Sequence, residues 1–255
     1  MNLKGKKALI TGGGTGLGRE IALQLAKEGV DMVLNYSTSA EETEKTAAEI
    51  AAGAAAGAGA AGVKAFALKA DVSIVEETEK LVEKSAELLG GLDILINNAG
   101  TTKFVRFQDL DGLNPDDFSR LYETNVMSIF FASRAAAKIM KKSGGGHIIN
   151  TVSTAGLTPA GSSIAYAVSK AAGIHMTKCL ALALAPEIKV NAVAPGLMMT
   201  RWVSGFSAEH IQAAKQKTLL NKTVGVEECA SMFLSIARND SMTGEIIKVD
   251  CGQVL

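Results

Sequence analysis

A tyrosine and a lysine four residues apart are the residues of this chain best suited to acid-base chemistry. Tyr166 and Lys170 lie in the segment Ser-Ile-Ala-Tyr-Ala-Val-Ser-Lys, and Ser153 precedes the tyrosine by thirteen residues. On a helix this spacing places both side chains on one face, so the ammonium can lie close to the phenol. Two unit charges about 4 Å apart at an effective dielectric of about 20 interact by about 4 kcal/mol, or roughly three pKa units. We therefore expect Lys170 to lower the pKa of the phenol from about 10 toward about 7, where a general acid or base works best.

A glycine-rich segment near the N-terminus, Thr11-Gly-Gly-Gly-Thr-Gly-Leu-Gly18, is typical of a nucleotide-binding turn. It follows an expected strand and opens an expected helix, whose N-terminus presents free amides to a phosphate. Gly12 would allow the tight turn, Gly16 the approach of a pyrophosphate, and Gly18 the close packing of helix on strand. The spacing is Gly-x-x-x-Gly-x-Gly, and a glycine-rich turn without a ligand is the alternative interpretation.

Short apolar runs alternate with longer helical patterns, an order typical of a parallel sheet with right-handed crossovers. We expect an α/β Rossmann fold, doubly wound around a mostly parallel seven-stranded sheet with helices on both faces, in a single domain over residues 1–255. About 1–150 would form the cofactor half and about 151–255 the catalytic part and substrate lid, with functional groups at the carboxyl ends of the strands. The expected strands are 7–11, 32–36, 63–68, 92–97, 147–152, 189–194 and 245–249, and the expected helices are 17–28, 39–52, 74–89, 115–142, 165–185 and 226–237.

Composition and charge argue against several classes of function. Lysine and arginine number 26, as do aspartate and glutamate, so no overall field attracts nucleic acid or an anionic membrane. The sequence contains neither a signal peptide nor an apolar run of about 18 residues, which predicts an unexported, cytoplasmic protein. The three cysteines are widely spaced and the three histidines lack metal-ligand spacing, so we expect a reducing compartment and no metal.

One stretch carries no functional side chain. Residues 51–62 contain only alanine and glycine, where a helix-to-strand turn of two to six residues would normally suffice. We interpret it as a surface excursion, or as a stretch whose true side chains are not recorded, and expect no chemistry in it.

Further motifs accompany the glycine-rich segment and the Tyr/Lys pair. In this order, and over essentially the whole chain, they resemble the short-chain dehydrogenase/reductase family, and most of all its 3-oxoacyl-acyl-carrier-protein reductases. The combination of motifs is what makes the resemblance specific, because a single one would persuade little. The motifs are Asp71-Val72, Asn97-Asn-Ala-Gly100, Asn125, Ser153, Pro195-Gly196 and the last strand Thr243-Gly-Glu-Ile-Ile-Lys-Val-Asp250.

The resemblance implies a catalytic set of four residues. Tyr166 would exchange a proton with the substrate oxygen, and Lys170 would lower the tyrosine pKa and bind the nicotinamide ribose. Ser153 would donate to the substrate oxygen, and Asn125 would hold a water that links Lys170 to solvent. Taken singly, each residue has a plainer interpretation: the serine as a turn or capping hydroxyl, the asparagine as a packing residue, and the Tyr/Lys pair as exposed stems.

The resemblance also implies a dinucleotide site that favours NADP(H) over NAD(H). No carboxylate follows the second strand before Glu41, and the hydroxyls of Ser37, Thr38 and Ser39 can donate to a 2′-phosphate. Against this, Thr15 stands where NADP-preferring relatives often carry a basic residue, and Arg19 lies one position beyond the motif. Asn97 would support the central sheet, and Asp71-Val72 would bind adenine unless the aspartate only caps a helix. The implied cofactor-binding residues are Gly12, Thr15, Gly16, Leu17, Gly18, Ser37, Thr38, Asp71, Val72, Asn98, Ala99, Gly100, Tyr166, Lys170, Pro195, Gly196 and Thr200.

Substrate choice should depend on residues 197–207, which carry the only tryptophan and a possible hinge at Gly205, and on the helix that follows. Such a lid could exclude water, although an apolar loop packed on a neighbouring subunit is the alternative. Residues 157–160 would form the facing wall. We expect no charged group in this pocket, which argues against an anchored carboxylate or phosphate.

The most favoured function is reduction of a 3-oxoacyl thioester, with an acyl carrier protein as a possible partner docking at Lys138, Lys141 and Lys142. A general carbonyl reductase, or an alcohol or sugar dehydrogenase, acting on another small molecule is the alternative. A dinucleotide-binding regulator without turnover is a third interpretation, which the intact catalytic set disfavours. The two long helices 115–142 and 165–185 are apolar on more than one face, which together with the family resemblance predicts a homotetramer through them.

Overall fold

Seven parallel strands form one sheet in the order β3-β2-β1-β4-β5-β6-β7 in this computed structural model, which describes residues 1–53 and 62–255. In the middle of the sheet β1 pairs with both β2 and β4, so the strand order reverses direction there. Such a reversal opens a crevice at the carboxyl ends of the strands, where ligands of doubly wound sheets bind. The interpretation of the alanine-glycine stretch concerns mainly residues 54–61, which lie outside the described residues. The strands are β1 (Lys7–Ile10), β2 (Asp31–Tyr36), β3 (Ala65–Lys69), β4 (Ile94–Asn97), β5 (Gly146–Thr151), β6 (Ile188–Pro195) and β7 (Ile246–Val249).

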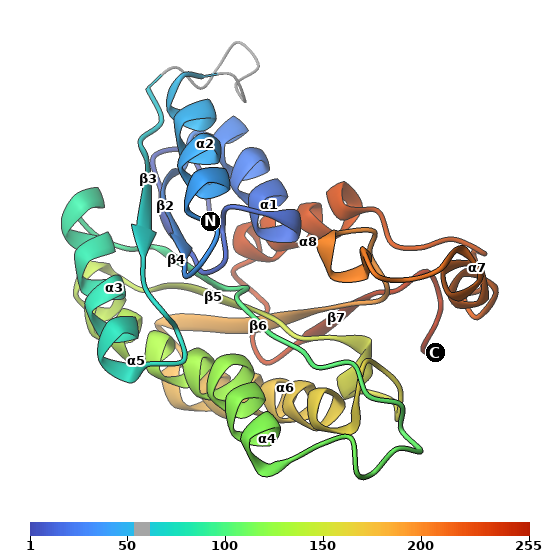
Figure 1. Ribbon diagram of the computed structural model, residues 1–255. Helices are drawn as coiled ribbons and strands as arrows, with labels where there is room; N and C mark the ends of the chain where they lie inside the picture. The colour runs from blue at the N-terminus through green and yellow to red at the C-terminus, as the bar shows by residue number, and fades with distance from the viewer. Residues whose placement is uncertain (54–61) are drawn as a thin grey trace.

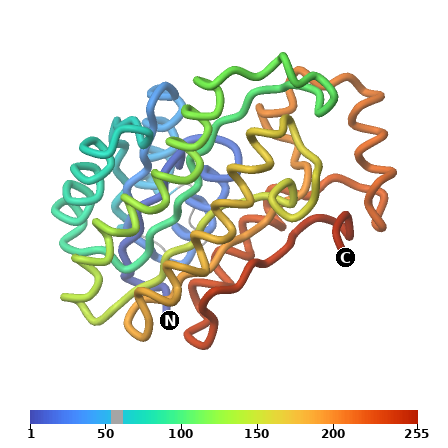
Figure 2. The backbone as a smooth tube through the Cα atoms, turned by 90° about the horizontal axis from the view of Figure 1, so that it is seen from below, coloured from blue at the N-terminus to red at the C-terminus, as the bar shows by residue number. Residues whose placement is uncertain are grey.

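Helices cover both faces of the sheet (Figure 1). One face carries α1, α2 and α8, and the other carries α3, α5 and α6, which lie side by side when the molecule is seen from below (Figure 2). The expected doubly wound Rossmann architecture is confirmed. The helices are α1 (Gly16–Lys27), α2 (Ala40–Ala51), α3 (Val75–Leu89), α4 (Pro115–Tyr122), α5 (Ser128–Met140), α6 (Ile164–Leu184), α7 (Ala208–Gln216) and α8 (Val226–Arg238).

Successive residues of the central strands point into two separate apolar layers. Ile10 and Ile96 pack with α1 and α8, whereas Leu9 and Leu95 pack with α3 and α5 on the opposite face. Because side chains alternate along a strand, a strand covered on both faces must be apolar at every position. The fully buried strands therefore leave their polar functional groups to the strand ends and the loops beyond.

The single helix expected over residues 115–142 is divided into parts. Asn114 caps the start of α4 in a reciprocal box with Asp117, and Pro115 occupies the first helical position. A π-helical turn, Glu123–Met127, then separates α4 from α5, and a 3₁₀ turn, Lys141–Ser143, ends the run. The side chain of Asn125, within the π turn, is hydrogen-bonded outside the helix, to Thr101 and Ser169. The uniform helical pattern of the sequence gave no sign of this interruption, because a π turn of this kind depends on tertiary contacts.

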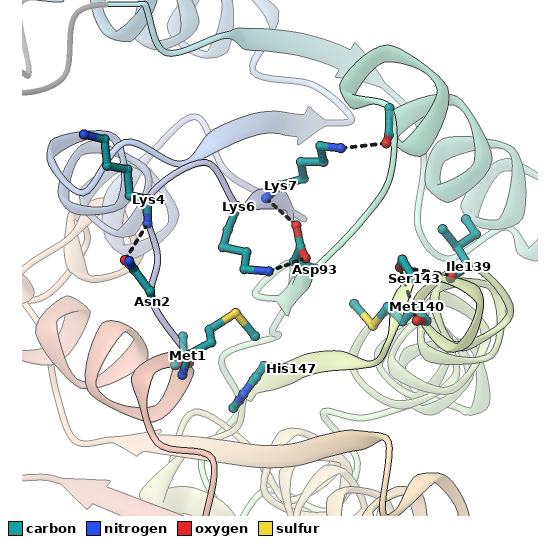
Figure 3. A network of polar contacts seen from close by, with 12 residues as sticks. Met1, Asn2, Lys4, Lys6, Lys7, Asp93, Ile139, Met140, Ser143 and His147 are labelled. Carbon is teal, nitrogen blue, oxygen red and sulfur yellow. Dashed lines mark hydrogen bonds and ion pairs between the residues drawn. The ribbon is translucent and has the colours of Figure 1, made fainter.

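Polar contacts brace the amino-end edge of the sheet, opposite the crevice. The carboxylate of Asp93 accepts from Nζ of Lys6 and from the backbone amide of Lys7, both at 3.0 Å, and so ties β1 to the start of β4 (Figure 3). His147 is buried at the start of β5, and its Nε2 lies 3.1 Å from Oδ1 of Asp240. Pairing among its own residues holds this edge together, although Nδ1 of His147 is buried without a hydrogen-bond partner among the described residues.

Within the described residues, none of the helices combines the length and apolar character needed to span a lipid bilayer.

Candidate active site

A cleft of about 1680 Å³ opens at the carboxyl ends of β1, β2, β4, β5 and β6. Two expected site residues, Gly18 and Asn125, are not part of its wall. All the others line it together: Gly12, Thr15, Gly16, Leu17, Ser37, Thr38, Asp71, Val72, Asn98, Ala99, Gly100, Ser153, Tyr166, Lys170, Pro195, Gly196 and Thr200.

The glycine-rich turn brings backbone amides to this cleft. Gly12 and Gly16 have φ of 61° and 51°, a left-handed conformation that glycine adopts without strain. A Cβ at Gly18 would collide with the carbonyl oxygen of Gly12, so α1 can approach the turn only because this residue has no side chain. Thr15, the N-cap of α1, makes no side-chain capping bond, which leaves the first amides of the helix available. A cradle of this kind suits the pyrophosphate of a dinucleotide.

Thr11 and Asn98 hold the turn against the end of β4. Oγ1 of Thr11 accepts from the backbone amides of Asn98 and Ala99 at 2.9 and 3.0 Å. The Asn98 side chain donates in turn to the carbonyl oxygens of Thr11 and Gly12, both at 3.1 Å. These bonds fix the distance between the ends of β1 and β4, which is the floor of the cleft. Asn98, one of the implied cofactor-binding residues, therefore also braces the glycine-rich turn.

Asn35 is a site residue that the sequence reasoning missed. It is buried at the end of β2, where Oδ1 accepts from the amide of Gly12 at 3.4 Å and Nδ2 donates to the carbonyl of Ala70 at 3.0 Å. It therefore joins the ends of β1, β2 and β3 along the cofactor half of the cleft. Its signal in the sequence was a single polar residue in an otherwise apolar run, because a buried amide needs hydrogen-bond partners.

The far end of the cleft carries the hydroxyls of Ser37 and Thr38, both exposed. Arg19 is not in the wall, because its guanidinium pairs with Glu49 of α2 at 2.6 Å. Asp71 lines this end beside Val72, and its Oδ1 accepts from the amide and hydroxyl of Ser73 at 2.9 and 2.7 Å. These bonds close a turn before α3, whose N-cap is Ile74, so the helix-capping role weighed for Asp71 is not found, and the carboxylate lines the cleft.

The catalytic candidates meet where β5 and α6 approach each other. Ser163 caps α6 by accepting from the amide of Tyr166 at 3.2 Å, which fixes the tyrosine in the first helical turn. Ser153 follows β5, and its Oγ accepts from the amide of Ala155 at 3.1 Å. Because Oγ accepts this bond, its own proton is free to point toward the phenol or a ligand. Ser153 is therefore a capping residue and a donor facing Tyr166 at once.

Burial dominates the ionisation of the Tyr166 and Lys170 pair. Lys170 is 4% exposed, and its Nζ donates to the carbonyl of Thr151 at 3.1 Å and lies 5.7 Å from the centre of the Tyr166 ring. Desolvation raises the pKa of Tyr166 to about 12, although the Ser153 hydroxyl lowers it, and desolvation lowers the pKa of Lys170 to about 8. The expected fall of the tyrosine pKa toward 7 is therefore wrong for this arrangement, because burial of the phenol outweighs the hydrogen bond from Ser153.

Asn125 lies outside the cleft wall and supports the site through its hydrogen bonds. Its Oδ1 accepts from the amide of Thr101 at 2.8 Å, and Nδ2 donates to the Thr101 carbonyl and to Oγ of Ser169, both at 3.0 Å. This amide links the loop after β4 to α6. Asn125 and Lys170 both lie near Gly100. A Cβ built on that glycine would be 3.3 Å from Oδ1 of Asn125 and 3.6 Å from Nζ of Lys170.

A family model for short chain dehydrogenases matches residues 6–210 of this sequence. The chain belongs to this family. Three proteins similar to this chain illustrate the variety within the family. Versicolorin reductase 1 of Dothistroma septosporum is 35% identical over 98% of this chain and 89% of its own length. A 3-oxoacyl-[acyl-carrier-protein] reductase of a Synechocystis species is 32% identical over 99% of this chain and 98% of its own. A short chain dehydrogenase from Burkholderia cenocepacia, solved in complex with NADP, superposes with a TM-score of 0.89 at 32% identity and covers 99% of both chains.

The segment after β6 lines the cleft of this short chain dehydrogenase on the side of Tyr166. A 3₁₀ turn, Arg201–Val203, is anchored by the buried Val203 and leads toward α7. Trp202 of this turn packs near Tyr166, with the ring centres 6.0 Å apart. On the facing wall Pro159 and Ala160 line the cleft, whereas residues 157 and 158 do not.

The expectation of an uncharged substrate pocket is wrong. Arg106, Arg120 and Arg201 all line the cleft of the short chain dehydrogenase. The first two come from the segment before α4 and from α4 itself, which the sequence alone did not place beside the lid. In the described part of the chain, no three His, Cys, Asp or Glu side chains are arranged to hold a metal ion.

Proposed function

We propose that this short chain dehydrogenase reduces a ketone to an alcohol with NADPH, with Tyr166 as the proton donor. The observation that carries the proposal is the convergence of Ser153, Tyr166 and Lys170 at the base of a cleft whose other half is a glycine-rich cradle. When bound, the nicotinamide supplies the hydride that adds to the carbonyl carbon. The glycine turn and the α1 amides would hold its pyrophosphate, and Lys170 its ribose.

The residues then have separate tasks in one proton transfer. Ser153, oriented by the Ala155 amide, donates a hydrogen bond to the carbonyl oxygen and stabilises the negative charge that develops there. Tyr166 transfers its phenolic proton to that oxygen, which completes the hydroxyl group. The cation of Lys170 stabilises the tyrosinate that remains until a proton returns from solvent. Oxidation of an alcohol follows the same steps in reverse.

The proton return path is proposed to pass the π turn at Asn125. Its side-chain amide already makes three hydrogen bonds, so a relay water would need the backbone carbonyl of Asn125 as its acceptor. Asn125 would therefore take part in the relay through its backbone carbonyl, while its side chain holds the surrounding loop and helix in place. Asn125→Ala should therefore disturb the loop after β4 as well as turnover.

NADP(H) is proposed over NAD(H) because the part of the cleft that follows β2, where a 2′-phosphate would lie, offers hydroxyl donors. Ser37 and Thr38 are exposed at the cleft, and the acidic residues that follow, Glu41 and Glu42, lie in the first turn of α2. Arg19 contributes no free charge, since Glu49 pairs with it. Initial rates with NADPH and NADH side by side test this preference. Thr38→Asp should shift it toward NADH by tenfold or more, on the order of one like-charge repulsion, with Thr223→Asp at another part of the cleft as the matched control.

A 3-oxoacyl thioester is the proposed substrate class, and support comes from the similarity to a 3-oxoacyl-[acyl-carrier-protein] reductase. Another small carbonyl compound, or an alcohol or sugar, is the second candidate, and the aromatic rings of the lid favour it. A carbonyl panel that includes an acetoacetyl thioester decides between them. Absence of NADPH oxidation with every member, together with tight NADPH binding, would favour the dinucleotide-binding regulator instead.

An acyl carrier protein is kept as a proposed partner, but with a different docking surface. Lys138, Lys141 and Lys142 end α5 just before β5 starts, at the amino-end edge of the sheet and away from the cleft. Arg106, Arg120 and Arg201 lie at the cleft itself and suit an acidic partner that delivers a thioester. Charge reversal at Arg120 should weaken carrier-bound substrate more than the free thioester.

We also propose a homotetramer in the cytoplasm, assembled through α4–α5 and α6. These helices expose large apolar side chains that a monomer would leave in water: Phe118, Tyr122, Phe130, Val168 and Leu182 are 44, 48, 37, 55 and 86% exposed. Sedimentation of Val168→Glu against the unmodified chain tests this interface.

A further inference from the structure

A second hollow of about 530 Å³ adjoins the substrate side of the cleft. It shares six lining residues with the main cleft: Gly100, Thr101, Phe104, Arg201, Trp202 and Gly205. Phe104 is 55% and Trp202 is 38% exposed, so two large rings present apolar surface to this space. The hollow is a shallow depression that opens widely to solvent.

Trp202 lines both spaces and is the aromatic neighbour of Tyr166. Its ring centre lies 6.0 Å from that of Tyr166 at an angle of 59°, and a Cβ built on Gly100 would be 3.9 Å from its Cη2. The indole thus reaches from the first turn of α6 to the loop after β4. Its backbone is fixed on one side by Thr200, whose hydroxyl accepts from the Trp202 amide at 3.4 Å, and on the other by the buried Val203.

A second aromatic contact ties the lid to the opposite loop. Phe206 meets Phe104 edge to face, with ring centres 5.5 Å apart at 76°, and His210 continues the row at 6.1 Å from Phe206. The Phe104 segment is itself anchored, because the amide of Val105 donates to the carbonyl of Ser162 at 2.8 Å. Phe104 and Trp202 are therefore two held rings that border one open space.

We propose that Trp202 and Phe104 form an aromatic subsite where the hollow joins the main cleft, and that the substrate carries an aromatic ring next to the carbonyl that is reduced. The ring would lie against Trp202 and Phe104 while the carbonyl oxygen reaches Ser153 and Tyr166. Aromatic rings gain more from such neighbours than alkyl groups of equal area do, because offset and edge-to-face contacts add to the burial of surface. The inference deepens the proposed reduction and depends on it for the chemical step.

Two matched substrates test the subsite without a change of reacting group. Acetoacetyl and 3-oxo-3-phenylpropanoyl thioesters of N-acetylcysteamine differ only in a methyl or a phenyl group on the ketone. The phenyl compound should have the higher kcat/KM, and Trp202→Leu should lower the ratio of the phenyl to the methyl kcat/KM about five- to tenfold. Trp202→Phe should recover most of the loss, because it restores a ring.

Leu110→Ala is the control variant, since Leu110 is 73% exposed and lines neither space. It should leave both thioesters unchanged. Equal losses with the two substrates in Trp202→Leu would make the indole a general part of the lid and overturn the subsite. The same conclusion would follow if Trp202→Phe were no better than Trp202→Leu.

Fluorescence tests binding apart from turnover. Trp202 is the only tryptophan, so the indole emission of the protein reports this position alone. In the presence of NADP⁺, the phenyl hydroxyacyl thioester should change that emission with saturation, at an apparent affinity at least several-fold tighter than that of the methyl analogue. An emission that responds equally to both would overturn the inference. Failure to oxidise NADPH with any carbonyl would instead refute the proposed reaction, while this titration still decides the subsite.

Discussion

The two edges of the sheet use the same strands and treat polar groups in opposite ways. At the amino-end edge, Asp93 is satisfied by Lys6 and by the Lys7 amide. At the carboxyl-end edge, Tyr166 faces an open cleft, and its phenol is left beside Ser153 in a site that penalises charge. One edge ties the chain together, and the other keeps donors available for a ligand.

The difference follows from the direction in which the chain enters each edge. At the carboxyl ends, strands lead into helix N-termini, whose first amides have no partner within the helix. At the amino ends, helices finish and return to strands through short turns, as at Gly90, which has φ of 72°. An edge built of helix N-termini favours bound anions, and an edge built of helix ends and returning strands favours closed pairing.

Removal of the phenolic hydroxyl should have the largest effect. In Tyr166→Phe we expect carbonyl reduction to fall about 10²- to 10⁴-fold, the range for loss of a general acid, with the midpoint of urea unfolding unchanged. Steady-state rates with NADPH and the acetoacetyl thioester measure it. Unchanged turnover would remove the assigned acid from this edge.

The pH profile should report Lys170. Its pKa is lowered to about 8 by burial, whereas the pKa of Tyr166 is raised to about 12. Above about pH 8 Lys170 loses its charge while Tyr166 keeps its proton, so kcat/KM for reduction should fall with rising pH, by up to tenfold per unit. Rates from about pH 6 to about pH 10, with NADPH binding measured separately, check this. A constant rate across that range would contradict it.

Substitution at the amino-end edge should affect stability without affecting catalysis. Asp93→Ala removes the acceptor of Lys6 and of the Lys7 amide, which should lower the free energy of unfolding by about 1–3 kcal/mol. Urea unfolding measures the loss, and kcat/KM of the folded variant should stay within about twofold, a loss of under about 0.5 kcal/mol. A large fall in turnover would show that the two edges are coupled.

The smallest effect is expected at His147. Burial lowers its pKa, as do the charges of the Met1 ammonium and Lys189 to a lesser degree, while Asp240 raises it. The folded protein therefore holds the ring neutral while the unfolded chain takes up a proton below about pH 6.5. Stability should fall as pH drops from about 6.5 toward the lower folded pKa, and His147→Asn should flatten that slope. An identical slope in both proteins would assign it to other groups, such as Asp240 itself.

Much of the site was predictable because it depends on spacing along the chain. The interval from Tyr166 to Lys170 fixes a shared helix face, and Gly12 and Gly16 adopt the left-handed conformation that their turn requires. Asn35 and Trp202 were harder to assign. Asn35 acts through atoms of the glycine-rich turn and of the segment after β3, and Trp202 through the ring of Tyr166 in α6. Their partners are distant in sequence, so no local pattern identifies them.

By itself the sequence determined the order of strands and helices, the turn that can cradle a pyrophosphate and the pairing of a phenol with an ammonium, because these follow from local geometry and side-chain period. Only the tertiary structure decided the ionisation of that pair, the π turn at Asn125, the arginines of the cleft and the ring that walls it. Each of these depends on contacts between segments that are distant in the chain, and on how completely those contacts exclude water. Solvent exclusion is a property of packing, and it reversed the expected direction of the Tyr166 pKa.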